Sequence, residues 1–336
     1  MKAVTIPEFG GPEVLRLVEL ADPVPGPGQV SVDVAYAGAN FAEVLYRRGM
    51  ADVPLPFVPG IEVSGRVRAL GPGVRGLAVG QPVAALTIVD SGGYAGTVVT
   101  AAELVVPLDG GSPSGDGATS GLDLATAAAV PSNTTTAYVV LNKIARVEAG
   151  QSVLVHAAAG GVGSQLGQVA RLLGAGRVVG TVGSPGKLEV AKAFGYDDVI
   201  LREEVAERAP GLTGGRGFDV VVDPVGGPTR RQSLDVLAPT GRLVVMGNAS
   251  GAADVAVSTI ELWLTNRAVA GFNLAAFTAA YPTQAGAALR WALRVVAAGD
   301  VQVAVEELTL EEAAEAHRRI ESGASTGKLV LRVGGA

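Results

Sequence analysis

The first third of the chain alternates between apolar residues and small or polar ones. The alternation is clearest in the segment QVSVDVAYAG at residues 29–38, and a period of two is typical of a strand with one buried face. Further short runs, separated by glycine and proline, follow at residues 63–71, 81–86 and 94–108. This part of the chain is therefore predicted to be rich in β-strands.

From about Ala125 the pattern changes to continuous apolar runs that alternate with segments of helical period. Apolar runs occur at residues 152–157, 176–184, 197–201, 217–223 and 241–246. Helices are expected between them: one that follows the first run through Leu173, one from Lys187 to Phe194 and one from Arg231 to Leu237. Apolar strands separated by helices imply a parallel sheet that is covered on both faces.

The C-terminal segment predicts one more helix and one more strand. Thr309 and Glu312 have the spacing of a capping box, acidic residues fill the first turn, and Gly323 follows a basic end. A strand is expected at residues 327–333. Between the two main parts of the chain, residues 108–123 are rich in glycine and serine, which indicates a surface loop.

Composition narrows the possible functions. The 336 residues suffice for two domains, and 48% are hydrophobic against 17% charged, as in a globular chain. There is no cysteine and there are two histidines, His156 and His317, which excludes disulfides, cysteine nucleophiles and cysteine-held zinc. The net charge of -6 argues against a nucleic acid partner. Because neither a signal peptide nor a membrane-spanning run is found, a cytoplasmic protein with no membrane partner is expected.

One turn carries the strongest chemical signal. It has the form Ala158-x-Gly160-x-x-Gly163 and lies between a buried strand and an amphipathic helix. Small residues there let backbone N–H groups approach a pyrophosphate, and the helix N-terminus adds a favourable partial charge. A packing turn without a ligand is the alternative. The repeated strand–helix context favours a dinucleotide cradle formed by Gly160, Gly161, Val162 and Gly163.

The end of the next strand indicates which dinucleotide binds. NAD sites usually place Asp or Glu there to bind the ribose 2′-hydroxyl, but this segment reads GTVGSPGK, with Val182 near the expected position. Gly183 and Ser184, with Lys187 and Arg202, are expected to surround a 2′-phosphate instead. Each cation alone is more typical of a solvated surface residue. Together with the missing acid, they favour NADPH.

At these motifs the chain resembles the zinc-free quinone oxidoreductase branch (zeta-crystallin-like) of the medium-chain dehydrogenase/reductase superfamily. The resemblance rests on VHAAAGGVGSQLGQVARLLGA, GTVGSPGKLEVAKAFGYDDVI and STGKLVLRV, and on YAGANFAEVLYRRG and FVPGIEVSGRVRALGPGV near the start. It implies an α/β fold in which a Rossmann doubly wound parallel sheet (residues 128–277) is inserted in a GroES-like β-rich catalytic domain (residues 1–127 and 278–336). It also implies an active site in the cleft between the two domains.

The zinc enzymes of this superfamily differ from the chain at their metal ligands. Asn40 stands where they have a cysteine, and Gly60-Ile61-Glu62 replaces their Gly-His-Glu motif. The cysteines that hold structural zinc are absent too. Neither histidine is expected to be a ligand: His156 is expected to be structural, and His317 to be a surface or packing residue. Without a Lewis acid to polarise an alcohol, the expected reaction is reduction of an electrophilic acceptor.

The resemblance also implies roles for individual residues. Those carried over as cofactor-binding are Asn40 and Thr136 near the nicotinamide, Asn248, Phe272 and Asn273 in loops that border it, and Lys328 in the C-terminal TGK segment. Turn chemistry is the alternative for the three asparagines. Tyr46 is the candidate proton donor, with solvent as the alternative.

The sequence therefore predicts a metal-free, NADPH-dependent reductase with Asn40 and Tyr46 as its catalytic residues. Its expected substrate is a small apolar quinone or α,β-unsaturated carbonyl. Two alternatives stay open: an enoyl reductase acting on a thioester or biosynthetic intermediate, and an NADPH-binding protein without turnover. The resemblance further implies a homodimer formed through the segment ELWLTNRAVAGFN.

Overall fold

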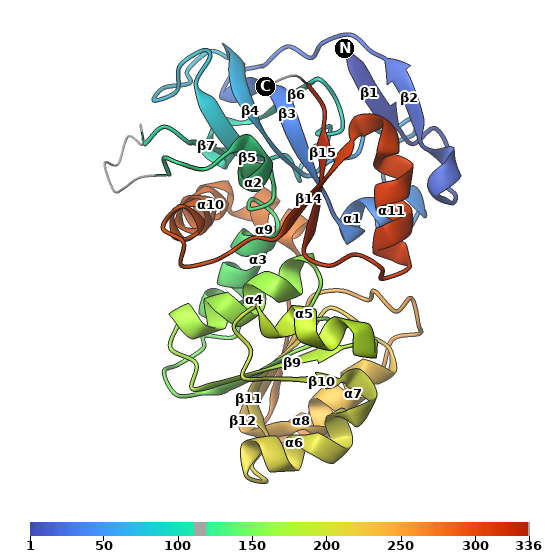
Figure 1. The fold of residues 1–336 in the computed structure, drawn as a ribbon, viewed down its shortest axis with the longest axis vertical. Helices are drawn as coiled ribbons and strands as arrows, with labels where there is room; N and C mark the ends of the chain where they lie inside the picture. The colour runs from blue at the N-terminus through green and yellow to red at the C-terminus, as the bar shows by residue number, and fades with distance from the viewer. Residues whose placement is uncertain (111–118, 335–336) are drawn as a thin grey trace. The chain divides into compact units, whose positions relative to one another are not determined.

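The computed structural model describes residues 1–110 and 119–334. Its elements fall into two compact units (Figure 1). Unit 1 comprises Met1–Thr135, Leu274–Gly299 and Val303–Ala336, and unit 2 comprises Thr136–Asn273 and Asp300–Gln302. Residues 111–118 of the glycine- and serine-rich loop expected at 108–123 lie outside the described residues.

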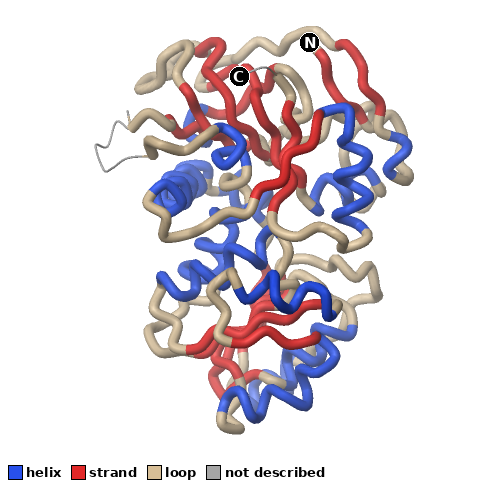
Figure 2. Tube along the Cα trace, viewed as in Figure 1, coloured by secondary structure: helices blue, strands red, loops and turns tan. Residues whose placement is uncertain are grey.

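Unit 2 is built on a six-stranded sheet in the order β10-β9-β8-β11-β12-β13, and every strand pair in it is parallel. Strands and helices alternate along this part of the chain (Figure 2). Numbered along the chain from β8, the strands lie in the order 3-2-1-4-5-6, which is that of a dinucleotide-binding doubly wound sheet. The strands are β8 (Ser152–Val155), β9 (Arg177–Val182), β10 (Asp198–Leu201), β11 (Phe218–Asp223), β12 (Leu237–Val245) and β13 (Ala268–Gly271).

Helices cover both faces of this sheet. In Figure 1, α4 (Gly161–Leu172) and α5 (Leu188–Lys192) lie on one face, and α6 (Val205–Thr213), α7 (Pro228–Asp235) and α8 (Thr259–Thr265) lie on the other. The helix α3 (Asn133–Tyr138) and a π-helix (Val139–Ile144) precede β8. Because both faces are covered, every residue of β8 and β11 is buried, and this explains their continuous apolar runs.

Two helix limits differ from the expectation. The helix expected at 231–237 begins at Pro228, because Gly227 turns the chain with φ +56 and proline is preset for the first helical turn. Leu237 instead starts β12, opposite Phe218. The helix expected at 187–194 is shortened to α5 because Pro185–Lys187 form a 3-10 turn before it.

Unit 1 is built on a seven-stranded, mostly antiparallel sheet in the order β14-β15-β3-β4-β5-β7, with β6 paired to β3. The long strand β3 (Gln29–Ala39) pairs with three strands, so that Ser31, expected on an exposed face, is only 1% exposed. The others are β4 (Glu62–Leu70), β5 (Pro82–Leu86), β6 (Thr97–Ala101), β7 (Val105–Pro107), β14 (Val305–Thr309) and β15 (Lys328–Arg332), and β1 (Lys2–Thr5) pairs with β2 (Arg16–Glu19) in a separate ribbon.

The helices of unit 1 are α1 (Phe41–Arg47), α2 (Leu124–Ala128), α9 (Leu274–Ala280), α10 (Pro282–Ala297) and α11 (Ala313–Glu321). The predicted capping box is confirmed, since the Thr309 N–H donates to Glu312 Oε2 at 2.7 Å. A 3-10 turn, Leu310–Glu312, then leads into α11. Across residues 1–110 and 119–334, no helix combines the length and the apolar character needed to cross a membrane.

Candidate functional site

The predicted cradle is the turn between β8 and α4. Gly160 is the N-cap of α4 in an extended conformation, and Gly161, Val162 and Gly163 form its first turn. Their N–H groups have no acceptor within the helix, and no acidic residue occupies the first turn. The start of α4 therefore carries an uncompensated positive partial charge that favours an anion.

The two glycines of the fingerprint have different surroundings. A Cβ on Gly163 would lie 2.1 Å from the carbonyl oxygen of Ala157, so no side chain fits between the turn and the helix. The Gly163 carbonyl also accepts a hydrogen bond from Tyr196 Oη at 2.5 Å. A Cβ on Gly160 would meet only Ala157 O, at 3.3 Å, and would otherwise project into open space. Gly163 allows close packing, and Gly160 leaves room for a ligand.

Two cations lie close together beyond the end of β9. The Arg202 guanidinium lies over Gly183, where an added Cβ would be 3.5 Å from Nη2. Burial and the nearby charge of Arg202 lower the pKa of Lys187, and burial lowers the pKa of Arg202 although Asp223 opposes it. Arg202 Nε is buried and lacks a hydrogen-bond partner in the described structure. Together with Ser184, which precedes Lys187 in the chain, these residues fit a 2′-phosphate dianion.

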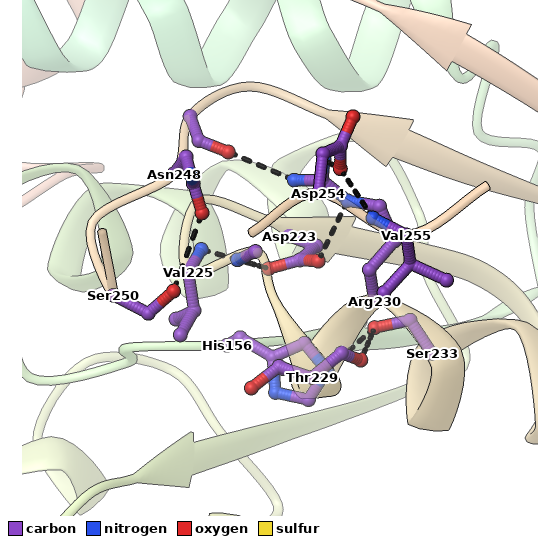
Figure 3. A network of polar contacts seen from close by, with 12 residues as sticks. His156, Asp223, Val225, Thr229, Arg230, Ser233, Asn248, Ser250, Asp254 and Val255 are labelled. Carbon is purple, nitrogen blue, oxygen red and sulfur yellow. Dashed lines mark hydrogen bonds and ion pairs between the residues drawn. The ribbon is translucent and has the colours of Figure 1, made fainter. Parts of the chain in front are cut away.

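His156, next to the cradle at the end of β8, is fully buried. Its Nδ1 accepts from Thr181 Oγ1 at 2.8 Å, and its Nε2 donates to Ser233 Oγ at 3.0 Å, because the Ser233 hydroxyl itself donates to Thr229 O. Burial lowers the pKa of His156 to about 4, so the ring is neutral at pH 7. Figure 3 shows it beneath Thr229 and Ser233 of α7, in a structural position.

The remaining predicted residues of unit 2 follow the carboxyl ends of its strands. Asn248 lies in the loop after β12, where its Nδ2 donates to Ala252 O at 2.9 Å. Phe272 and Asn273 follow β13, and the Phe272 N–H extends the pairing by donating to Val245 O at 2.9 Å. All three follow the carboxyl ends of parallel strands, and doubly wound proteins bind their ligands at this end of the sheet. Thr136 lies in α3 and is 5% exposed.

In unit 1, a cluster of polar side chains surrounds Asn40, the N-cap of α1. Lys328 Nζ contacts both Asn40 Oδ1 and Glu62 Oε1, and Asn40 Nδ2 donates to the same Glu62 oxygen at 2.9 Å. The Asn40 N–H donates to Glu43 Oε2 at 3.0 Å. Lys328 is 2% exposed, and Glu43 and Glu62 are fully buried. The structure therefore brings together Asn40 and Lys328, which the sequence placed separately.

This cluster fixes the orientation of the Asn40 amide. The lysine ammonium only donates, so it holds Oδ1, and the carboxylate of Glu62 only accepts, so it holds Nδ2. The second Nδ2 hydrogen faces Gly38 O, at 3.4 Å. What Asn40 retains for a ligand is a lone pair on Oδ1. This oxygen can accept a hydrogen bond from a hydroxyl or amide donor, and both Nδ2 hydrogens already face protein acceptors.

Tyr46 is half-buried and packs edge-on against Phe57, with ring centroids 5.6 Å apart. Burial, helped by the negative charge of Glu43, raises the pKa of Tyr46 to about 12, so the phenol keeps its proton at pH 7. Burial also raises the pKa of Glu43 to about 7, against the pull of Lys328.

The charged partners of the candidate site residues were not identified from the sequence. Glu43 follows Asn40 at the spacing of a capping box, a signal that was available. Glu62 was noted only as part of a motif that lacks its histidine. Asp223 and Arg230, which meet at the ends of β11 and α7, carry no local signal, because their contact depends on the strand order.

Two family models match the chain. The one described as alcohol dehydrogenase GroES-like domain matches residues 26–110, and the one described as zinc-binding dehydrogenase matches residues 161–291. The chain is 34% identical to a quinone oxidoreductase of Pseudomonas aeruginosa, with 98% of this chain and 99% of the relative covered.

One solved structure and one longer protein add to these matches. The crystal structure of Escherichia coli quinone oxidoreductase complexed with NADPH has a TM-score of 0.88 to this chain at 30% identity. The match covers 99% of this chain and 100% of the Escherichia coli chain. A mycocerosic acid synthase-like polyketide synthase of Mycolicibacterium smegmatis is 32% identical over 96% of this chain, which amounts to 15% of that protein. With these matches, the strand order and the motifs, the chain belongs to the zinc-free quinone oxidoreductase branch of the medium-chain dehydrogenase/reductase superfamily.

Proposed function

We propose that this protein is a metal-free, NADPH-dependent reductase that passes a hydride to a quinone or an α,β-unsaturated carbonyl. The observation that carries the proposal is the pair of cations at the end of β9. Lys187 and Arg202 lie close enough for one to lower the pKa of the other, and the strand end between Val182 and Lys187 has no carboxylate. Such a site suits a 2′-phosphate and disfavours NADH.

The chain's own residues bind and orient in this proposal. When bound, the nicotinamide supplies the hydride. The N–H groups at the start of α4 hold the pyrophosphate, and Asn248, Phe272 and Asn273 border the nicotinamide half. Thr136 is also proposed to lie near this half.

Two residues of unit 1 are proposed to take part in the reaction. Asn40 offers its oriented Oδ1 as an acceptor, with Lys328 behind it. Tyr46 is the proposed proton donor, since a phenol carries its proton at pH 7.

A second candidate function is enoyl reduction on a thioester, which the similarity to the polyketide synthase favours. NADPH consumption by the purified protein separates the candidates when 1,4-benzoquinone, 9,10-phenanthrenequinone and a trans-2-enoyl thioester are compared. Oxidation by the quinones supports the first function, and oxidation by the thioester alone supports the second. Tight NADPH binding without oxidation by any of them would overturn quinone reduction and enoyl reduction, and would leave an enone substrate or a binding protein without turnover.

We also propose that the protein is a homodimer that works in the cytoplasm. Among the residues that the structure describes, β13 is the last strand of its sheet and has no neighbouring strand on one side. On the helix before it, Ile260, Trp263 and Leu264 are 60%, 73% and 69% exposed. An unpaired edge beside a group of large apolar side chains suits pairing with a second copy of the chain.

A further inference from the structure

Arg230 on α7 connects the two loops that follow β11 and β12 (Figure 3). The residue is 5% exposed. Its Nε lies 3.4 Å from Asp223 Oδ2, its Nη1 lies 2.7 Å from Asp254 Oδ1, and its Nη2 donates to Gly247 O at 2.8 Å. One buried guanidinium therefore reaches the first loop at Asp223 and the second loop at two points.

The first loop and the near half of the second, residues 246–250, also have contacts that do not involve Arg230. Asp223 Oδ1 accepts the N–H groups of Val225 and Gly226 at 2.7 and 2.9 Å. Backbone bonds then link the loops, from Ala249 N to Pro224 O at 3.0 Å and from Ser250 N to Val225 O at 2.9 Å. The packing is close, since a Cβ on Gly226 would lie 2.2 Å from Asn248 Oδ1.

In the far half of the second loop, Arg230 supplies the polar contact to the rest of unit 2, and Val257 packs against the apolar core. In residues 251–257, as the structure describes them, the polar contacts stay within the loop, except that Asp254 reaches Arg230. The Asp254 side chain is 73% exposed, whereas that of Arg230 is 6% exposed. A solvated carboxylate on the loop is thus joined to a cation anchored in the fold. Asn248 is tied to this half through its bond to Ala252 O.

We propose that Arg230 is a positioning residue for the dinucleotide. Through Gly247 and Asp254 it orders residues 246–254 in advance and so holds Asn248 at the carboxyl end of β12, where ligands bind in doubly wound sheets. Ordering a loop before binding lowers the entropy cost of binding, so Arg230 acts on the affinity for NADPH and not on the hydride transfer that follows. The inference rests on the proposed function.

The test uses Asp254→Asn, which changes an exposed side chain and leaves the buried guanidinium in place. The Kd for NADPH is expected to rise about 5- to 10-fold, with kcat at saturating NADPH within about twofold of wild type. Amide hydrogen exchange of the nucleotide-free protein is expected to speed up in residues 246–257. Arg230→Lys is expected to keep part of the affinity that Arg230→Gln loses.

Arg231→Gln is the matched control, because Arg231 lies next to Arg230 but binds Asp235 and Glu261 on the exposed side of α7. It is expected to leave the Kd and the exchange of the loop unchanged. In the double variant Arg230→Gln with Asp254→Asn, the loss of affinity should be no larger than in Arg230→Gln alone. An unchanged Kd and unchanged exchange in Asp254→Asn, with normal binding by wild type, would overturn this inference alone. Failure of wild type to bind NADPH would overturn the proposed function and this inference with it.

Discussion

Gly160 and Gly163 belong to one turn, but their substitution is expected to have different consequences. Gly163→Ala should lower the free energy of unfolding by about 1–3 kcal/mol, because its Cβ would lie 2.1 Å from Ala157 O. Gly160→Ala should keep most of the stability, since its Cβ would be 3.3 Å from the same oxygen, and should weaken NADPH binding instead. Urea unfolding and a fluorescence titration measure the two effects. An equal loss of stability in both variants would contradict this account of the turn.

The lysine beside Asn40 offers a comparison between a buried and an exposed ion pair. Lys328→Met leaves Glu62 buried without its cation, which should cost about 3–5 kcal/mol of unfolding free energy. Lys2→Met removes a solvent-exposed pair with Glu311 and should cost less than about 1 kcal/mol. Urea unfolding of both variants measures the difference, and similar losses would show that the Asn40 cluster is not held as described.

At the level of single residues, the sequence indicated candidate site residues but not the side chains that they contact. Asn40 and Lys328 came from separate motifs and are 288 residues apart in the sequence, so no local pattern predicted that one orients the amide of the other. The cations at the end of β9 were found because the strand-end rule looks for an acid there. Arg230 was missed because its partners lie on two different loops.

Helix α11 is fixed to α1 through a buried histidine whose titration has a predictable sign. Arg47 Nε donates to His317 Nδ1 at 3.2 Å, and burial, assisted by the Arg47 charge, lowers the pKa of His317 from 6.5 to about 3. The unfolded chain therefore binds a proton below pH 6.5 that the folded protein does not, so stability falls as the pH falls from 6.5 towards 3.

His317→Gln removes this pH-dependent contribution to the free energy of unfolding and keeps a hydrogen-bond acceptor for Arg47. Between pH 7 and pH 5, wild type should lose about 2 kcal/mol more unfolding free energy than the variant. Urea unfolding at both pH values gives the comparison, and His156, which has the same sign, contributes equally to both proteins. Identical losses in wild type and variant would show that His317 has the same pKa in the folded and the unfolded protein.

Elements were predicted well where hydrophobic period and caps agreed. The capping box at Thr309 and the apolar runs of β8 and β11 needed no tertiary knowledge. The start of α7 was misplaced because Pro228 and the positive φ of Gly227 extend the helix towards its N-terminus. The burial of Ser31 was missed because it depends on which strands pair with β3.

For the whole molecule, the proposed dimer gives the clearest prediction. Trp263→Glu places a charge in the group of exposed side chains beside β13 and should shift the protein from dimer to monomer in light scattering at micromolar concentration. Val79→Glu, a similarly exposed position of unit 1 at 67%, is the control and should leave the dimer intact. A monomeric wild type would contradict the proposal.

The fold class and the family followed from the order of motifs, and the strand order of unit 2 and the relatives confirm both. The substrate did not follow, because residues that recognise it are brought together from remote segments. Asn40 shows the difficulty: its type suggested a hydrogen bond, but only its contacts with Lys328 and Glu62 show how its amide is oriented.

The most direct test of the central claim is a paired titration of wild type, Lys187→Ala and Arg202→Ala with NADPH and NADH. Wild type should prefer NADPH by about 10- to 100-fold, the worth of one or two charge-assisted hydrogen bonds. Each variant should lose much of that preference while its affinity for NADH stays within about twofold. Arg208→Ala, an exposed position on α6 that pairs with Glu204, should behave as wild type. Equal affinity of wild type for both nucleotides, or binding of neither, would contradict the account.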